Sequence, residues 1–156
     1  MSLGRYASRD GRGVDLDDPV VTESMRRASV DHLAHRAFPN LSLGEQRRVL
    51  LARAIATGAT TVLLDEPDAY LDVGQRVRLF ALLEELRDEG TTLLVVVHAL
   101  DEARQHADAC VVLERGALIA SGAPLEVLDE PTLTRVFDVS IDERSAPRFV
   151  VPRGGV

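Results

Sequence analysis

The chain has 156 residues, of which 46% are hydrophobic, and a formal net charge of −7. This length favours one domain, and the hydrophobic fraction is enough for a packed core, which excludes a disordered chain. The acidic balance argues against a nucleic-acid binder, and the single cysteine, Cys110, excludes a disulfide framework and is predicted to be a buried core thiol. No signal peptide and no apolar run of about 18 residues is evident, so we expect a cytoplasmic protein without membrane insertion of its own.

The first predicted elements are helical. Residues 4–18 lack periodicity and predict a loop. The Asp-Pro pair at 18–19 then predicts a helix that runs to about Ala28, because Asp caps helices and Pro suits the first turn. Ser29 is expected to cap a second short helix that ends at His35. The first helix has one apolar side, formed by Val21, Met25 and Ala28.

A longer helix is predicted over residues 42–57. Ser42 and Glu45 have the spacing of a capping box, and Gly58 is a typical helix stop. Directly after it, the apolar residues 61–64 predict a short buried strand.

Helices and strands then alternate to the end of the chain. An amphipathic helix is predicted over 73–87 with Gly90 as its stop, and the continuously apolar residues 91–97 predict a parallel strand covered on both faces. The apolar side of that helix is expected to consist of Val73, Val77, Phe80 and Leu83. The later predicted elements are a helix at 100–106, a strand at 109–113, a turn at 114–117 into 118–120, helices at 124–128 and 131–137, and a strand in the tail from 148. This alternation indicates an α/β protein with a parallel sheet.

Polar residues follow both strands of the predicted sheet. Asp65 and Glu66 come directly after the first strand, and His98 follows the second. In open parallel sheets, ligands bind beyond the carboxyl ends of the strands. There, Asp65 would suit Mg²⁺ bound through its water shell, and Glu66 would suit a water that attacks a phosphate. A charged turn stopped by Pro67 is the alternative, but the apolar strand before it and the Tyr-Leu-Asp at 70–72 favour the functional interpretation.

The start of the 42–57 helix is a second candidate site. Free backbone amides and the positive end of the helix dipole at residues 42–45 form an anion site, and Gly44 would let the backbone approach a phosphate closely. Taken alone, Ser42 and Glu45 would be better interpreted as a simple helix cap. All 18 basic residues are arginines, so these 156 residues contain no GxxxxGK[ST] phosphate loop.

In this order and spacing, LSLGEQRRVLLARAIA (41–56), TTVLLDEPDAYLD (60–72) and VVVHAL (95–100) resemble the ATP-binding cassette (ABC) ATPases. The resemblance implies a signature motif that binds the nucleotide of a partner cassette, formed by Ser42, Leu43, Gly44 and Glu45. It implies four further roles: Asp65 of Walker B for Mg²⁺, Glu66 as catalytic glutamate, Asp72 as D-loop dimer contact, and His98 as switch histidine.

The implied fold is a fragment of the P-loop NTPase-like ABC cassette. It comprises a parallel sheet flanked by helices and part of the helical subdomain, and it lacks the phosphate-loop strand. The implied division is a helical, signature-bearing portion at 1–58 and the C-terminal half of a RecA-like ATPase core at 59–156.

The sequence departs from the family pattern at two signature positions. Leu43 stands in place of a glycine and Glu45 in place of a glutamine. The leucine adds a side chain where the backbone nears phosphate, and the glutamate opposes the attraction of the helix dipole for an anion. The phosphate loop, the adenine-stacking strand and the Q-loop of the family have no counterpart here. We therefore expect a slot in the sheet with unpaired backbone groups, so that the isolated chain is unstable or another chain fills the slot.

The resemblance implies an ATP-binding subunit of an ABC importer, in which Mg²⁺-dependent ATP hydrolysis drives transmembrane uptake. Residues 3–40 and 123–139 resemble importer cassettes that serve iron–siderophore, haem or cobalamin permeases. The implied cofactors are ATP and Mg²⁺. The implied partners are a second cassette or the missing N-terminal half, together with permease subunits that would hold the chain at the inner face of the cell membrane; nucleic acid is not expected.

Two alternatives remain open for the function. One is a non-catalytic half-cassette that docks on a full cassette or on a permease, and the other is a gene remnant without a role. In the leading interpretation, too, we expect no measurable ATPase activity from the chain alone.

Overall fold

A computed structural model of the chain describes residues 16–137, 140–142 and 148–150. The chain forms two compact units, Met1–Val97 and His98–Val156. The loop predicted before residue 16 lies outside the described residues. The predicted division at 58/59 concerns functional portions and stays a prediction.

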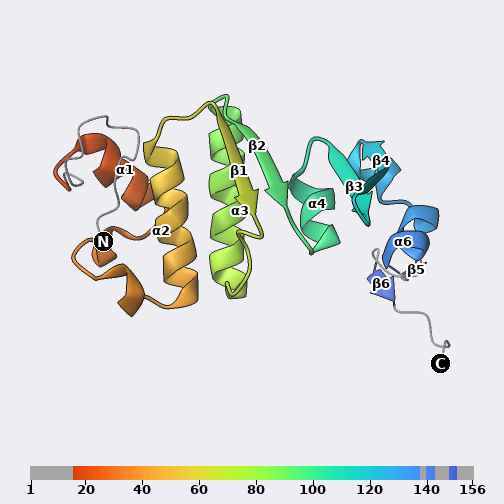
Figure 1. The fold of residues 1–156 in the computed structure, drawn as a ribbon, viewed down its shortest axis with the longest axis horizontal. Helices are drawn as coiled ribbons and strands as arrows, with labels where there is room; N and C mark the ends of the chain where they lie inside the picture. The colour runs from red at the N-terminus through yellow and green to blue at the C-terminus, as the bar shows by residue number, and fades with distance from the viewer. Residues whose placement is uncertain (1–15, 138–139, 143–147, 151–156) are drawn as a thin grey trace. The chain divides into compact units, whose positions relative to one another are not determined.

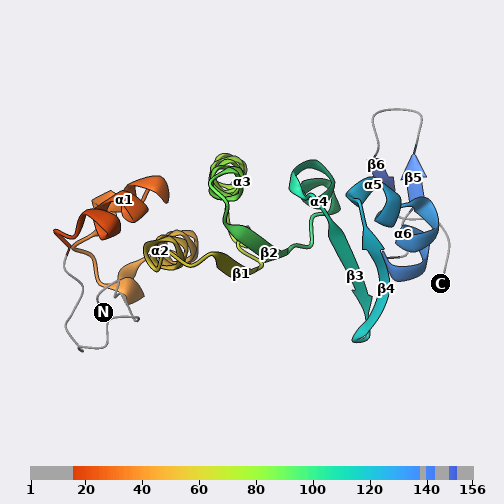
Figure 2. The same ribbon diagram turned by 90° about the horizontal axis from the view of Figure 1, so that it is seen from above.

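The first unit contains the two parallel strands. Its elements are α1 (Pro19–Arg27), the 3₁₀ turns η1 (Asp31–Leu33) and η2 (Phe38–Asn40), α2 (Leu43–Ala56), β1 (Thr61–Asp65), α3 (Val73–Asp88) and β2 (Thr92–Val96). Strands β1 and β2 point the same way (Figure 1), in a register that begins at Thr61 opposite Thr92 and ends at Asp65 opposite Val96. Helix α3 covers one face of this pair (Figure 2). The predicted α/β class with a parallel sheet is therefore confirmed.

The end of α1 corrects one prediction. Ser29, which was expected to cap a second helix, has a left-handed backbone with φ of 55°. The N–H groups of Ser29 and Val30 donate to the carbonyls of Arg26 and Met25 at 3.0 and 2.9 Å. This is a Schellman ending, in which the residue after the cap turns left-handed to satisfy the last carbonyls of the helix. Only the short turn η1 follows, in place of the helix predicted to end at His35.

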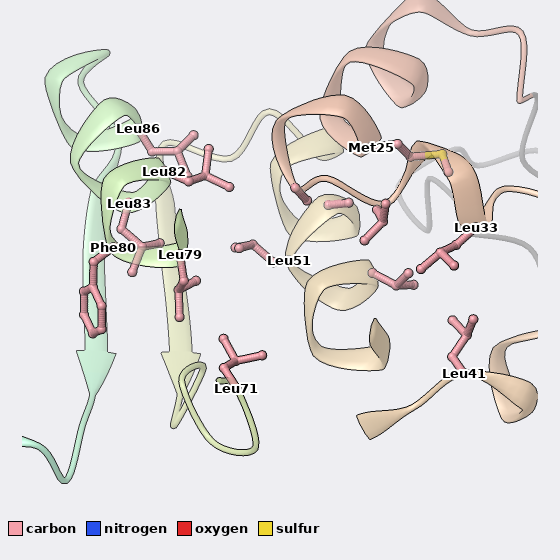
Figure 3. Close-up of a cluster of buried hydrophobic side chains, with 14 of the residues drawn as sticks. Met25, Leu33, Leu41, Leu51, Leu71, Leu79, Phe80, Leu82, Leu83 and Leu86 are labelled. Carbon is pink, nitrogen blue, oxygen red and sulfur yellow. The ribbon is translucent and has the colours of Figure 1, made fainter. Parts of the chain in front are cut away.

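One hydrophobic cluster joins α1, α2, α3 and the covered face of the strands. Figure 3 shows Leu51 of α2 on the side of α3 that carries Leu79 and Leu82, whereas Phe80 lies on the other side of α3. Arg27 adds a polar link, because its guanidinium donates two hydrogen bonds of 2.9 Å to the Glu89 carboxylate just after α3. The three helices therefore share one core with the sheet.

The buried side of α3 differs from the predicted one. Phe80 and Leu83 are buried as predicted, but Val73 and Val77 are 77% and 65% exposed. A helix of this length spans about 24 Å and a strand like β1 about 17 Å, so part of the helix has no strand to cover. Figure 1 shows the start of α3 extending beyond the strands. The buried residues of α3 are Leu79, Phe80, Leu82, Leu83 and Leu86.

The strands of this unit are covered on one face, and the prediction of cover on both faces is wrong for the described residues. Side chains that face the helices alternate along β1 and β2 with side chains that do not. Leu63, Leu94 and Val96 lie on the open face, and Leu63 is 73% exposed. Parallel sheets are normally covered on both faces, so this apolar surface is unusual.

The second unit contains α4 (Leu100–His106), β3 (Cys110–Glu114), β4 (Ala117–Gly122), α5 (Pro124–Val127), α6 (Glu130–Phe137), β5 (Ser140–Asp142) and β6 (Arg148–Val150). The β3–β4 hairpin turns at Arg115 and Gly116, both at positive φ as a two-residue hairpin turn requires. The elements predicted between 100 and 137 are confirmed to within one or two residues. The predicted tail strand is β6, which pairs with β5.

A separate small core holds the second unit together. It consists of Val112, Val127, Leu128 and Leu133. Cys110 is half-buried against it, and burial raises the pKa of the thiol, which disfavours the reactive thiolate. Among the described residues, no helix has the length and apolar composition to cross a bilayer.

Candidate functional site

The end of β1 carries the two predicted carboxylates. Asp65 is the last residue of the strand and is exposed. The N–H of Glu66 donates to the carbonyl of Val96 at 3.0 Å, so Glu66 is still held against β2. Its φ is 46°, a left-handed conformation that is uncommon for a residue with a side chain. Backbone strain of this kind gathers at functional sites, which is consistent with a role for Glu66.

The loop from Glu66 to the start of α3 is compact. The N–H of Ala69 donates to the Glu66 carbonyl, and the N–H of Leu71 donates to the Asp68 carbonyl, both at 3.2 Å. Leu71 points into the core, whereas Tyr70 is exposed and has φ of 65°. The loop therefore has a defined shape that is anchored at Leu71.

Asp72 ends this loop as the N-cap of α3. Its carboxylate accepts a hydrogen bond of 2.7 Å from the backbone N–H of Gln75. This bond satisfies one of the free amides at the helix start. The predicted contact of Asp72 with a second cassette stays a prediction beside this local role.

The start of α2 has the predicted capping box. The N–H of Glu45 donates to the Ser42 hydroxyl oxygen at 3.3 Å, and the N–H of Ser42 donates to the Glu45 carboxylate at 2.7 Å. The hydrogen bond from the Ser42 N–H to the carboxylate, followed by the interaction of the Ser42 hydroxyl with that carboxylate, lowers the pKa of the Glu45 carboxyl. The Glu45 carboxylate thus accepts the hydrogen bond of the Ser42 N–H, one of the backbone N–H groups that an incoming anion would meet. Leu43, between them, is exposed.

Gly44 is buried against the start of α3. A Cβ at this position would lie 3.3 Å from Gln75 Oε1 and from Leu71 Cδ2, and 3.4 Å from the Tyr70 carbonyl oxygen. The predicted reason for the glycine, close approach to phosphate, stays a prediction, and packing is a second reason. Sequence reasoning missed Gln75, although it follows Asp72 at the spacing at which Glu45 follows Ser42.

The first unit thus brings several of the predicted residues to one end of the strand pair. The starts of α2 and α3 are in contact through Gly44, and the loop that joins the end of β1 to α3 forms part of that contact. His98 is the first residue of the second unit, and its predicted contact with a phosphate stays a prediction.

A family model described as ABC transporter matches residues 8–69. Over 147 residues the chain is 41% identical to the hemin import ATP-binding protein HmuV of Nocardia farcinica, with 94% of this chain and 51% of the relative covered. It is 38% identical over 142 residues to the cobalamin import ATP-binding protein BtuD of Halobacterium salinarum, with 90% and 36% covered. It is 33% identical over 161 residues to the ferric enterobactin transport ATP-binding protein FepC of Escherichia coli, with 99% and 59% covered.

Solved structures give the same result. The fold is similar to that of a protein described as a metal-chelate type ABC transporter in an inward-facing conformation, with a TM-score of 0.75, 25% identity, and 89% of this chain and 58% of that chain covered. It is also similar to the ADP form of MJ1267, an ATP-binding cassette of an ABC transporter, with a TM-score of 0.65, 27% identity and 75% and 48% covered.

The chain belongs to the ABC family. It spans about half the length of the hemin-import relative. Family membership accords with the α/β fold and with a helix start beside the end of a parallel strand.

The ABC family implies a nucleotide and Mg²⁺, and the described residues fit Mg²⁺ in part. Asp65 offers an exposed carboxylate, and Mg²⁺ in nucleotide sites usually takes about one or two carboxylates with water and phosphate as its other ligands. Among the described residues, no group of three or more His, Cys, Asp or Glu could hold a metal.

Proposed function

We propose that this chain contributes to the ATP-binding subunit of an ABC importer. The observation that carries the proposal is the contact between the starts of α2 and α3, beside the loop that begins at Glu66. The relatives reported above are named as ATP-binding proteins of hemin import, cobalamin import and ferric enterobactin transport. The proposed reaction is Mg²⁺-dependent hydrolysis of ATP coupled to uptake.

In this proposal the described residues supply half of a shared site. Glu66 positions the attacking water, and Asp65 holds Mg²⁺ through water. Ser42 and the amides near Gly44 contact the γ-phosphate of a nucleotide that another polypeptide segment holds. His98 is proposed to contact the phosphate and Asp72 to contact the second cassette. Leu43 and Glu45 are proposed to belong, with Ser42 and Gly44, to the signature that binds the nucleotide.

The phosphate loop of such a site needs a lysine, which these 156 residues do not contain. We propose that a segment outside this sequence supplies that loop and covers the open face of β1 and β2. Leu63, Leu94 and Val96 on that face support this, because an exposed apolar sheet face favours association.

The proposed substrates are metal chelates of the iron–siderophore, haem or cobalamin type. The support comes from the names of the relatives and from the structural similarity to a metal-chelate type transporter. The proposed partners are permease subunits, which would place the chain at the inner face of the membrane.

The test is nucleotide binding and turnover by the purified chain, alone and with full-length HmuV. We expect no turnover by the chain alone and ATP-dependent association with the full-length cassette. Ser42→Arg should abolish this association, whereas Ser121→Arg, the same change at an exposed position of β4, should leave it unchanged. Turnover by the pure chain at rates typical of complete cassettes would refute the proposal of a shared site.

A second candidate is a non-catalytic module that docks on a full cassette and contributes only the start of α2 to the nucleotide site. The Glu45 carboxylate on the Ser42 amide favours this alternative, because it places a negative charge where phosphate would bind. A complex whose ATPase activity requires Ser42 of this chain but not Glu66 would support the module. A complex that requires both residues would support the catalytic proposal, and the absence of any complex would contradict both.

A further inference from the structure

Gly44 stands at a position where glycine has a conformational cost. It is the second residue of α2 and is not among the described residues with positive φ, so no left-handed backbone requires a glycine there. Glycine destabilises a helix relative to alanine, because it loses more backbone freedom on folding. The reason for Gly44 must therefore lie in what surrounds it.

The surroundings of Gly44 leave little room for a side chain. Contacts of 3.3 Å to Leu71 Cδ2 and Gln75 Oε1 would be tighter than ordinary packing, and the Tyr70 carbonyl at 3.4 Å belongs to the backbone. Leu71 is buried and Tyr70 is held in a left-handed conformation. A methyl group on Gly44 would therefore require the Leu71 side chain to shift by a few tenths of an ångström inside the core, with the Tyr70 backbone already in contact on another side.

Gly74 provides a matched comparison inside the same chain. It is the second residue of α3, as Gly44 is of α2, and it is exposed. A Cβ on Gly74 would meet nothing nearer than Asp72 Oδ1 at 3.5 Å, which is ordinary contact. Gly44 and Gly74 thus occupy the same position in their helices, but only Gly44 is closely surrounded by other residues.

We infer that Gly44 is a positioning residue that fixes the start of α2 on residues 70–75, the end of the loop and the start of α3. The inference rests on the proposed function, because the proposal assigns Ser42 and Asp72 to one shared site. Because Gly44 has no side chain, the starts of α2 and α3 come into contact there. This contact sets the position of Ser42 relative to Asp72. A methyl group there would push the α2 start away from the loop and so separate the two parts of the site.

The test combines Gly44→Ala with a change that restores the missing space. Leu71→Val and Gln75→Ala together shorten the two side chains that a Cβ at Gly44 would meet. Four proteins are compared: Gly44→Ala, Gly74→Ala, the Leu71→Val/Gln75→Ala pair, and that pair with Gly44→Ala added. The readouts are the backbone amide NMR signals of residues 70–75, the melting temperature, and ATP-dependent association with full-length HmuV.

We expect Gly44→Ala to move the amide signals of residues 70–75 and to weaken the association by about tenfold. Gly74→Ala should leave the association within about twofold of the parent chain. Adding Gly44→Ala to the pair should then cost less than about threefold, because the space is restored. The inference would be overturned by unmoved signals in Gly44→Ala, or by a loss of association that the pair does not relieve.

A direct clash with phosphate is the competing explanation for a loss of association. It predicts the loss without a change at residues 70–75 and without relief by the pair. If the parent chain shows no ATP-dependent association, the proposed function fails. The inference about Gly44 is then still decided by the amide signals, which should move between the parent chain and Gly44→Ala but not when Gly44→Ala is added to the pair.

Discussion

The starts of α2 and α3 follow one five-residue pattern in two different environments. LSLGE at 41–45 and LDVGQ at 71–75 each contain a buried leucine, a polar cap, an exposed apolar residue, a glycine, and Glu or Gln. In both, the cap side chain accepts a hydrogen bond from the backbone N–H three residues later. The shared pattern therefore specifies a helix start.

The two starts differ in what lies beside the glycine. At α2 the glycine is buried and the Glu45 carboxylate returns to the Ser42 N–H. At α3 the glycine is exposed, and the side-chain oxygen of Gln75 lies beside Gly44. Identical local rules thus build one helix start whose glycine is buried and one whose glycine is exposed, so tertiary contact decides the surroundings of each glycine.

The largest expected effect concerns what the two starts share. Leu41→Ala and Leu71→Ala should each destabilise the chain by about 2–4 kcal/mol, because each removes a buried leucine that closes the core below a helix start. Val73→Ala, at an exposed apolar position of the pattern, is the control and should change stability by less than about 0.5 kcal/mol. Urea unfolding measures all three. A neutral Leu41→Ala would show that the two starts are not equivalent.

The glycines should then separate the two starts. Gly44→Ala should destabilise the chain by about 1–2 kcal/mol, because crowding outweighs the gain in helix propensity. Gly74→Ala should stabilise it by about 0.5–1 kcal/mol, because only the propensity changes. Melting temperatures of the two variants provide the measurement. Changes of the same sign would contradict the proposed difference in packing.

The caps should have similar, smaller effects. Ser42→Ala and Asp72→Ala each leave a helix amide without its partner and should cost about 1 kcal/mol. Replacement by Asn, which also caps helices, should recover most of the loss at either position. Denaturant titrations of the four variants test this. If the alanine change lowered stability at only one of the two helices, the two caps would not be equivalent.

The smallest effect is a pH dependence at the α2 start. The Ser42 N–H lowers the pKa of Glu45 in the folded chain, so the stability that this bond contributes is complete above the unfolded-state pKa. It is lost as the pH falls through the lowered pKa of the folded chain. Glu45→Gln keeps the capping box but cannot titrate, so its unfolding should lack this acid-dependent component. Equal pH profiles for the parent chain and for Glu45→Gln would contradict the prediction.

Local signals in the sequence predicted the helix starts and most helix ends well. Gly58 and Gly90 end α2 and α3 at positive φ, as expected for glycine. Ser29 was assigned to a helix start because serine is a common N-cap. In the structure it ends α1 instead, and its carbonyl accepts a hydrogen bond from Arg48 of α2. Ser29 thus adopts a left-handed conformation that is unfavourable for serine, and it does so beside a contact with Arg48, a residue distant in the chain.

Burial was predicted less well because it depends on what lies across from each side chain. The apolar runs of β1 and β2 are typical of strands covered on both faces, yet Leu63 and Leu94 are exposed. Val73 and Val77 have the spacing of a buried helix face, but they precede the buried residues of α3, which begin at Leu79. The spacing and type of the apolar residues identify a segment as helix or strand. Which of its faces is buried depends on the elements that pack against it.

The sequence by itself determined most of the helix and strand order, the capping box at Ser42 and the family of the protein, because these depend on residues close together in the chain or on motifs in a set order. Only the tertiary structure decided which glycine is crowded, which faces are open and that Gln75 meets Gly44. Such contacts join residues about 30 positions apart in the chain. This separation is far longer than the helical period of about 3.6 residues, so no local periodicity encodes them.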